Sequence, residues 1–482
     1  MITFFCCAAF LAAGYAFYGR LVEKAAKPTD SPTPAYASQD GVDYIPLPTW
    51  KVFLIQLLNI AGTGPIFGAL MGAVFGPIVF LWIILGNILG GAVHDYMAGI
   101  ISVRMNGASI SEIVGQYLGN GMKQVMRAFS VGLLILSGAV FITCPAVLIA
   151  SLTPAFLDKN FWVIVILIYY ILATLLPIDK LIGKIYPVFG IVLILMVVLI
   201  ASAIVIQGRT IPELTLANLH PDGLSPWPFM FITVACGAVS GFHSTQAPLM
   251  ARCIKTERDA RKAFYGAMVM EGVIALVWAA AGAAFYETTG GLQEALAGLG
   301  QSGVVYTIST GLLGLTGGIL AVIGVIVCPI STGDTAFRSA RLTIADAFHL
   351  NQKDLKSRIP LTALIMIVGG LLTLVDFDII WRYMSWANQT LSCIVLWTAA
   401  VYLRWHAGRK ACMITVIPAV FMTAVCTTYI LMAPEGFSLP ASIGFPAGAL
   451  AAFLNLGMFM LKCYVKDKAP AALQLKPAAS AG

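Results

Sequence analysis

The chain has 482 residues, of which 59% are apolar and 11% are charged, and its mean hydropathy is +0.89. Soluble domains carry about 25% charged residues, so this composition excludes a soluble globular protein and indicates a polytopic membrane protein. The formal net charge of +7 does not require nucleic acid, because membrane topology accounts for it; anionic lipid headgroups are the expected neighbours. Ten cysteines form no CxxC pair, and we expect free thiols.

Thirteen apolar segments are long enough to cross a bilayer as helices. They cover residues 2–18, 52–75, 77–103, 127–150, 161–178, 182–206, 229–251, 264–286, 304–330, 360–380, 386–403, 411–432 and 441–461. The first segment lacks the basic start of a secretory signal, since Arg20, Lys24 and Lys27 follow it. We therefore interpret it as a retained helix.

The distribution of basic residues supports this count. With the N-terminus outside, thirteen spans place all but three of the 29 Lys and Arg residues in the cytoplasm. The three exceptions are Lys159, Arg209 and Arg382. A wrong count would scatter these charges between the two sides. We expect a multi-pass protein of the bacterial cytoplasmic (inner) membrane, with a cytoplasmic C-terminus.

Two of the spans are interrupted near their middles by small and helix-breaking residues. The second span contains AGTGP at 61–65, and the seventh contains CGAVSGFHS at 236–244. Unwound backbone inside a membrane is tolerated where it is buried in protein or lines a cavity, so both breaks predict a binding site. The predicted substrate-binding residues are Gly62, Thr63, Gly64, Gly237, Ser240, Gly241, Phe242, His243 and Ser244. Half-helix N-termini attract anionic groups, which favours a small carboxylate or a zwitterion.

The broken spans lie five apart, and an odd offset reverses their direction across the membrane. This predicts an all-α protein with an inverted five-plus-five repeat, the first half at 52–228 and the second at 229–403. The remainder of this single membrane domain is an N-terminal helix with a basic turn (1–27), a cytoplasmic loop (28–51), two additional helices (404–468) and a disordered tail (469–482). The segment Asp334 to Leu350 has charged helical periodicity and predicts an amphipathic helix on the cytoplasmic surface.

Ionisable residues inside spans cost about 2.5–3.5 kcal/mol each, so each is a candidate for proton or ion coupling. His94 and Asp95 are either functional or a water-exposed pair near the inner face. His243 either exchanges a proton or makes a structural hydrogen bond between helices. Glu271 either carries the coupled proton or pairs with Arg252 or Lys262.

The end of the ninth span offers further polar groups. Ser331 and Thr332 could face the second span and assist ion coupling, and Asp334 could join them or cap the following helix. Two other sets favour packing roles. Asn388 and Gln389 either reach the cavity or link helices by hydrogen bonds, and we expect the second. The glycines at 86, 90 and 91 are expected to allow close helix approach.

The chain also resembles a known family. The matching stretches are VDYIP at 42–46, AGTGP at 61–65, GAVHD at 91–95, FITVACGAVSGFH at 231–243, YGAM at 265–268, GDT at 333–335, RSAR at 338–341, NQ at 388–389 and IPAV at 417–420. Together they resemble the carbon starvation protein A family of peptide and pyruvate transporters, which looks like a branch of the amino acid–polyamine–organocation superfamily. The resemblance implies a LeuT-like core. The chain departs from longer members, which carry additional helices, and many members have Gln where this chain has His94.

Other function classes lack their signatures. The pair Gly183-Lys184 is followed by Ile185, so no phosphate-binding motif supports ATP-driven transport. Neither HExxH nor an acid evidently poised to orient His243 supports a protease. We predict a secondary transporter, not an enzyme, with no cofactor and no metal. It would import pyruvate or short peptides with protons, or with sodium as the alternative ion, in carbon starvation. A membrane nutrient sensor or a channel remains the other interpretation.

Overall fold

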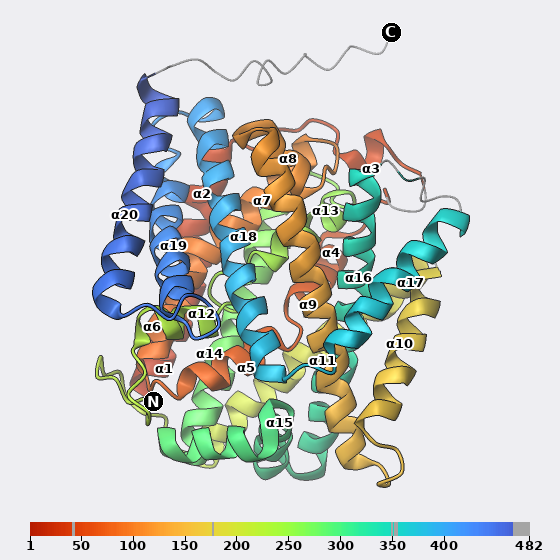
Figure 1. Cartoon of the computed structure of the whole chain (residues 1–482), viewed down its shortest axis with the longest axis vertical. Coiled ribbons are helices and arrows are strands. Elements are labelled where there is room, and N and C mark those ends of the chain that lie inside the picture. The colour runs from red at the N-terminus through yellow and green to blue at the C-terminus, as the bar shows by residue number, and fades with distance from the viewer. Residues whose placement is uncertain (41–43, 176–177, 349, 351–354, 466–482) are drawn as a thin grey trace.

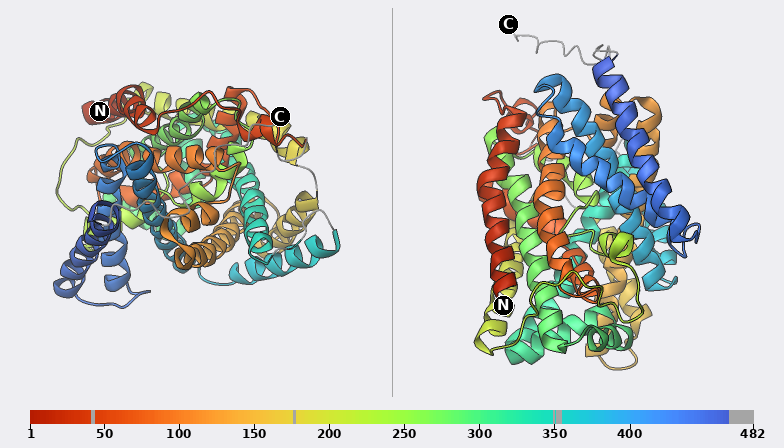
Figure 2. Two further views of the ribbon diagram at one scale, coloured as in Figure 1. Left: turned by 90° about the horizontal axis from the view of Figure 1, so that it is seen from above. Right: turned by 90° about the vertical axis from the view of Figure 1, so that its left-hand side faces the viewer.

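The computed structural model describes residues 1–40, 44–175, 178–348, 350 and 355–465, and these residues form helices and loops without a strand. Most helices run roughly along the long axis of a single bundle (Figure 1), as the two further views in Figure 2 also show. The predicted tail at 469–482 lies outside the described residues.

The first half of the chain supplies the helices up to residue 206. Their bounds are α1 Ile2–Ala13, α2 Gly19–Ala26, α3 Pro34–Ala37, α4 Thr49–Ile60, α5 Gly64–Ala73, α6 Ile78–Gly86, α7 Ala92–Arg104, α8 Ile110–Leu118, α9 Asn120–Leu152, α10 Lys159–Leu175 and α11 Ile178–Ile206. Short π-helical segments join α1 to α2 (Gly14–Tyr18) and α6 to α7 (Asn87–Gly91).

The second half supplies the remaining helices. Their bounds are α12 Phe231–Thr233, α13 Phe242–Ala251, α14 Gly266–Tyr286, α15 Thr289–Val322, α16 Cys328–Ala347, α17 Leu355–Leu372, α18 Phe377–His406, α19 Met413–Met432 and α20 Ala441–Met460. Further π-helical segments lie at Pro226–Met230, Arg261–Tyr265, Ile323–Val327 and Leu461–Val465, and a 3-10 turn at Glu257–Asp259.

Eight helical stretches in the described residues are long and apolar enough to cross a membrane. They are Ile2–Ala26, Ile78–Arg104, Asn120–Leu152, Pro187–Ile206, Glu257–Tyr286, Thr289–Val322, Met413–Met432 and Ala441–Cys463. The pair α4–α5 counts as one more if its two bent parts form a single span. A multi-pass membrane protein is therefore confirmed, whereas the count of thirteen spans and the inverted repeat stay predictions.

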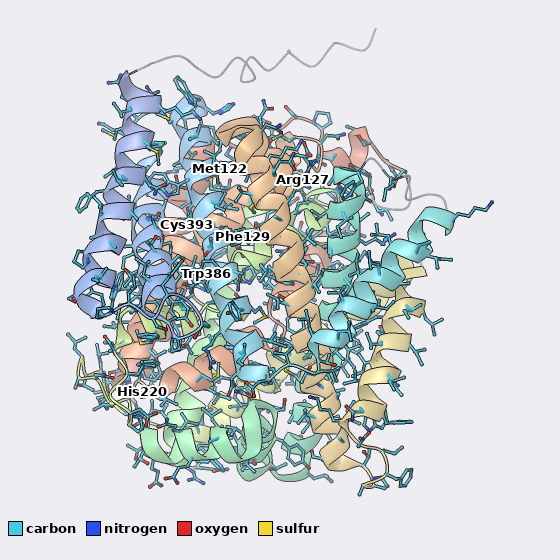
Figure 3. All side chains as sticks on the ribbon, viewed as in Figure 1. Met122, Arg127, Phe129, His220, Trp386 and Cys393 are labelled. Atoms are coloured by element: carbon cyan, nitrogen blue, oxygen red, sulfur yellow. The ribbon has the colours of Figure 1, made fainter. Side chains whose placement is uncertain are left out.

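The two ends of the bundle carry different polar groups. At the lower end in Figure 1, where the chain begins, the terminal amine of Met1 pairs with Glu213 at 2.5 Å. Helix α2, toward the upper end in Figure 1, contributes Glu23, which pairs with Arg261 at 2.8 Å; Asp30 pairs with Arg258 at 3.1 Å. Figure 3 shows Arg127 near that same end and His220 near the other. The described chain thus ends, after α20, opposite to where it starts.

Helix α9 runs through the bundle and packs against α8, α10, α16 and α18. Its Phe129 meets Trp386 of α18 edge to face, with ring centroids 5.9 Å apart, and both are labelled in Figure 3. Gly138 of α9 lies so close to Phe337 of α16 that a Cβ there would come within 2.3 Å of the ring. Small residues therefore let these helices approach, as is common in membranes.

The expected surface position of the helix at Asp334 to Leu350 is wrong for residues 334–341, which are buried, whereas Asp346, Phe348 and Leu350 are exposed. These residues belong largely to α16, where the buried set extends from Cys328 to Arg341. The charged side chains are accommodated inside the bundle because Arg338 donates to the carbonyl of Ala173 at 3.0 Å. Periodicity alone could not distinguish a polar face toward lipid headgroups from one toward other helices.

Candidate functional site

The first break lies between α4 and α5, whose axes differ by 51°. Pro65 stands in the first turn of α5, where its missing N–H is tolerated, and residues 61–63 are not helical. The freed carbonyl of Leu58 accepts from the Thr332 hydroxyl of α16 at 3.1 Å. The predicted facing of Thr332 and the second span is thereby confirmed.

The second break separates α12 from α13 and leaves residues 234–241 outside regular α-helix. Gly237 has φ of +87°, which a residue with a side chain rarely adopts. Gly237, Ser240 and Gly241 lie in this unwound stretch, as predicted. Phe242, His243 and Ser244 instead form the first turn of α13, so their backbone continues a helix.

Three side chains from neighbouring helices hold the second break. Trp82 donates to the Val234 carbonyl at 2.9 Å, and Asn87 donates to the Gly237 carbonyl at 2.9 Å. At the other end, the Asn388 side-chain oxygen accepts from the Phe242 amide at 2.6 Å. The backbone freed by unwinding is therefore satisfied by protein, which is the condition for breaking a helix at membrane depth.

The sequence predicted bonds from two of the amide side chains around the second break, Asn388 and Gln389, and missed Asn87. Asn388 also accepts from Ser240 at 3.1 Å, so the expected bonds between helices are present. Gln389 donates to the Phe231 carbonyl at 2.5 Å. Asn87 was not anticipated, although an amide inside a strongly apolar segment was the available signal.

The two breaks lie directly against each other. A Cβ on Gly64 would stand 2.4 Å from Cys236 Sγ, and one on Gly68 would stand 3.0 Å from the Thr233 carbonyl oxygen. Gly90 and Gly91, in the π-helical segment before α7, pack on the second break, since a Cβ on Gly91 would come within 2.2 Å of the Ala238 carbonyl oxygen. Glycine is therefore needed at these positions because it has no side chain and lets the breaks touch. This role is separate from its backbone flexibility.

A chain of four ionisable side chains crosses the interior beside the second break. His94 Nδ1 lies 2.7 Å from Asp95 Oδ1, and Asp95 Oδ2 lies 2.8 Å from His243 Nδ1. His243 Nε2 then faces Glu271 Oε1 of α14 at 3.5 Å. All four side chains are at most 1% exposed. We call His94, Asp95, His243 and Glu271 the buried relay.

The structure gives the positions of three predicted residues of the relay, His94, Asp95 and Glu271. His94 and Asp95 are fully buried, so they are not a water-exposed pair near the inner face. Glu271 pairs with His243 and not with Arg252, which donates to the Gly107 carbonyl at 3.1 Å. An acid does orient His243, contrary to the expectation from sequence, because Asp95 comes from α7, far away along the chain.

The chemistry of the relay follows from its hydrogen bonds. One Asp95 carboxylate can accept an N–H from each imidazole, which orients His243 with Nε2 toward Glu271. Neither oxygen of Glu271 has a hydrogen-bond partner among the described residues. A bare imidazole nitrogen facing a bare carboxylate would be repulsive, so a proton on either group would stabilise this contact.

Cys236 adds a thiol to this place. The donor atoms of Cys236, His243 and Glu271 lie within 4.8 Å of one another, which makes them the described group with spacing suited to a metal ion. The Cys236 thiol also lies 3.7 Å from the Ser240 hydroxyl.

The residues predicted at the end of the ninth span are not part of the relay. Ser331 donates to the Cys328 carbonyl of its own helix at 2.7 Å. Asp334 pairs one turn further on with Arg338 at 3.5 Å. Thr332 is the member that approaches a break, since a Cβ on Gly62 would lie 3.1 Å from its hydroxyl.

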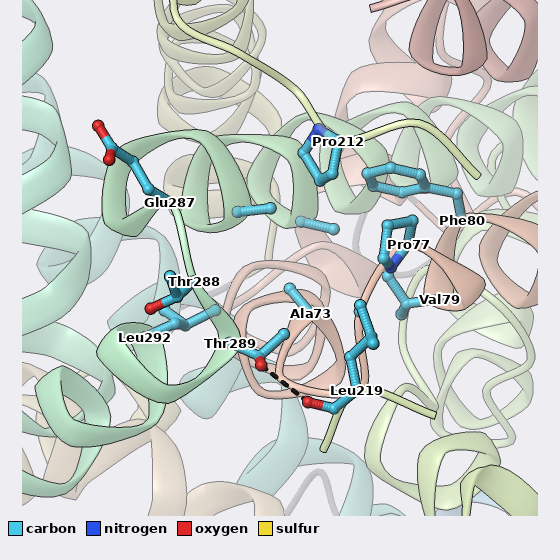
Figure 4. A pocket seen from close by; sticks show the side chains of 13 residues that line it. Ala73, Pro77, Val79, Phe80, Pro212, Leu219, Glu287, Thr288, Thr289 and Leu292 are labelled. Carbon is cyan, nitrogen blue, oxygen red and sulfur yellow. Dashed lines mark hydrogen bonds between the residues drawn. The ribbon is translucent and has the colours of Figure 1, made fainter. Parts of the chain in front are cut away.

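Several cavities in the described part of the chain are lined by residues other than the four of the relay. One of about 300 Å³ lies between α5, α14, α15 and the loop before α12, where Thr289 donates to the Leu219 carbonyl (Figure 4). Another, of about 260 Å³, includes Thr143, Lys159 and Asp378. A third, of about 420 Å³, is almost wholly apolar and includes Trp82 and Phe421.

Comparison with known proteins gives consistent matches. A family model described as carbon starvation protein CstA matches residues 1–155 and 147–290. An uncharacterized membrane protein of Haemophilus influenzae is 42% identical over 351 residues, covering 61% of this chain and 94% of that protein.

Two similar relatives have functional names. The peptide transporter CstA of Bacillus subtilis is 28% identical over 338 residues, covering 56% of each chain. The pyruvate/proton symporter BtsT of Escherichia coli is 29% identical over 312 residues, covering 51% of this chain and 43% of that protein. The matched region thus spans about half the length of these named transporters.

A solved structure is similar in fold. The crystal structure of the Eremococcus coleocola manganese transporter, in complex with an aromatic bis-isothiourea substituted compound, aligns with a TM-score of 0.54 at 11% identity. The alignment covers 88% of this chain and 96% of that one, so the arrangement of helices is that of a known transporter.

Proposed function

The chain belongs to the carbon starvation protein CstA family, and from this premise we propose that it is a secondary active transporter that imports a small carboxylate nutrient with protons. Its family and its named relatives are transporters and not enzymes. The proposed substrates are pyruvate and short peptides, which are the two solutes that the names of the relatives mention.

The buried relay is the observation that carries the proposal. Four ionisable groups without exposure to water are costly inside a membrane protein and are found there mainly in ion and proton pathways. The relay starts in α7 and ends in α14, passing through His243 in the first turn of α13. A proton bound between His243 and Glu271 would therefore sit directly beside unwound backbone that a substrate could contact.

The breaks provide the proposed substrate site. The half-helices α5 and α13 begin at the breaks, so the positive ends of their helix dipoles face the region where the two breaks meet. A substrate carboxylate bound there would compensate the charge of the proton on the relay. Binding of both would then favour the change between outward and inward states, with α4–α5, α7, α13 and α14 moving against the other helices.

The proposed orientation follows the positive-inside rule. The upper end of the bundle would be cytoplasmic, with Met1 outside, in the inner membrane of a bacterial-type cell. Sodium in place of protons is an alternative coupling ion; its expected ligand Thr332 instead donates directly to the Leu58 carbonyl.

Uptake into liposomes tests the proposal. The purified protein is reconstituted, an inward proton gradient is imposed, and labelled pyruvate and a labelled dipeptide are offered separately. Accumulation that collapses when an ionophore abolishes the gradient supports proton symport. Accumulation that depends on a sodium gradient alone would contradict the choice of ion, and binding without movement of either solute would favour the sensor.

A further inference from the structure

Two carboxamides inside α4 have none of their polar atoms hydrogen-bonded. Gln56 is 0% exposed and Asn59 is 1% exposed, and both the amide nitrogen and the amide oxygen of each lack a partner among the described residues. Leaving a buried polar group unsatisfied costs about 1–3 kcal/mol, so such groups usually meet a ligand or an ordered water. We call Gln56 and Asn59 the α4 amide pair.

The amide pair occupies one face of its helix. Residues three apart on an α-helix lie next to each other, so both side chains project together. Leu54 marks the opposite face, since its Cβ lies 3.4 Å from the position that a Cβ on Gly190 of α11 would take. The pair thus turns away from α11, and the helices that also pack on α4 include α13 and α14.

These two helices carry further buried groups without a hydrogen-bond partner among the described residues. On α13, Gln246 is 0% exposed and its amide oxygen lacks a partner, one turn after His243. On α14 the Glu271 carboxylate makes no hydrogen bond to the described residues, although it faces His243 at 3.5 Å. Such groups on α4 and on the two helices packed against it point to one shared ligand more directly than any of them alone.

We infer that the α4 amide pair binds the transported solute next to the first break, on the side of α4. The pair would select carboxylates that also carry an N–H donor. A carboxamide offers two donors and one acceptor. Pyruvate has acceptor oxygens and no donor, so it would leave Gln56 Oε1 and Asn59 Oδ1 without partners. An amino acid or short peptide has an ammonium or amide N–H that satisfies both.

The inference rests on the proposed function and assigns the substrate class of that site. The expected selectivity can be bounded. Sites built to hydrogen-bond a donor reject analogues that lack it by about 10⁴–10⁵-fold, and a partly hydrated site rejects them less. We expect L-alanyl-L-alanine or L-alanine to bind at least tenfold more tightly than pyruvate.

Calorimetric binding to the purified protein tests this, with pyruvate, L-alanine and L-alanyl-L-alanine as ligands. Pyruvate and L-alanine share three carbons and a carboxylate and differ at the second carbon. Gln56→Leu and Asn59→Leu are expected to reduce the preference for the N–H-bearing compounds to within about threefold, with affinity for pyruvate unchanged. The matched control is Asn455→Leu in α20, because that amide bonds within its own helix at 2.9 Å.

Thermal unfolding without ligand supplies a second readout. If the amides await a solute, replacing them by leucine removes unsatisfied groups and raises the melting temperature. If ordered waters satisfy them permanently, the leucine variants melt lower and keep the wild-type ligand preference, which would overturn the inference. Tighter binding of pyruvate by the wild type would also overturn it.

The two proposals fail separately. Gradient-driven pyruvate uptake with no role for the amide pair would leave the transporter proposal standing and remove this one. Selective binding that depends on the amide pair, without gradient-driven uptake, would support the inference on the amide pair and contradict the transporter proposal.

Discussion

His243 Nε2 and Glu271 Oε1 lie 3.5 Å apart with no other hydrogen-bond partner for either atom among the described residues. Since the opposite side of the imidazole is held by Asp95 at 2.8 Å, the ring cannot turn away without losing a buried ion pair. The distance leaves a gap that a shared proton can close, and that is the physical basis of the proposed coupling.

Glu271→Gln keeps the shape of the side chain and removes its ability to ionise. We expect accumulation driven by a proton gradient to fall at least tenfold, while exchange of labelled for unlabelled substrate without a gradient stays within about threefold. Both are measured in liposomes. Glu294→Gln, at an exposed carboxylate of α15, is the control. Normal accumulation by Glu271→Gln would remove Glu271 from the coupling step.

Asp95→Asn tests whether the relay acts as one unit. The amide cannot accept from both imidazoles with the strength of a carboxylate, so His243 would lose its fixed orientation. Because Asp95 and His243 are in contact, their effects should not add: the double variant with His243→Ala should be little worse than the poorer single variant. Initial uptake rates of all four proteins measure this, and strict additivity would argue for independent roles.

Gly64→Ala should disable transport because the added methyl group would clash with Cys236 of the second break. Its new Cβ would lie 2.4 Å from Cys236 Sγ and 2.6 Å from Cys236 Cβ. Cys236→Gly removes both atoms, so adding it should restore at least part of the lost uptake, whereas Cys236→Ala should not. Gly457→Ala is the control, since nothing lies within 4 Å of that position. If Cys236→Gly fails to rescue a folded Gly64→Ala protein, the contact is not the cause.

Glu257→Gln should lower the melting temperature in detergent. Glu257 is 5% exposed and accepts from Arg104 at 2.8 Å, and Arg104 also donates to the Ala26 carbonyl. Hydrogen bonds to charged groups contribute about 1.5–3 kcal/mol, and the loss should be of that order. Arg258→Gln breaks an exposed pair with Asp30 and should change the melting temperature little. Equal effects of both changes would contradict this ranking.

Cysteine labelling tests the orientation. In a Cys6→Ser background, Asn160→Cys should react with a membrane-impermeant maleimide in intact cells, and Lys410→Cys only after the cells are opened. Both positions are exposed. The reverse pattern would invert the proposed topology, and labelling of both from outside would contradict an odd number of crossings between them.

The sequence predicted the two breaks better than it predicted the contacts of the buried relay. The breaks are local events: glycine and proline in AGTGP and the glycines of CGAVSGFHS prevent continuous helix, and the structure confirms both interruptions. The second break begins two residues earlier, at Val234, because Trp82 and Asn87 of another helix compete for its carbonyls. No local pattern carries that information.

Composition and periodicity by themselves determined that the chain is an all-helical membrane protein with two interrupted spans and a few costly buried charges, because each of these depends on neighbours in sequence. Only the tertiary structure decided the partners. It brought Asp95 to His243 and His243 to Glu271, set Gly64 against Cys236, and turned α16 into the bundle. It also left the side chains of Gln56 and Asn59 without hydrogen-bond partners in the part of the chain that the structure describes. Hydrogen bonds and ion pairs inside a bundle depend on distances between helices, and sequence spacing does not fix those distances.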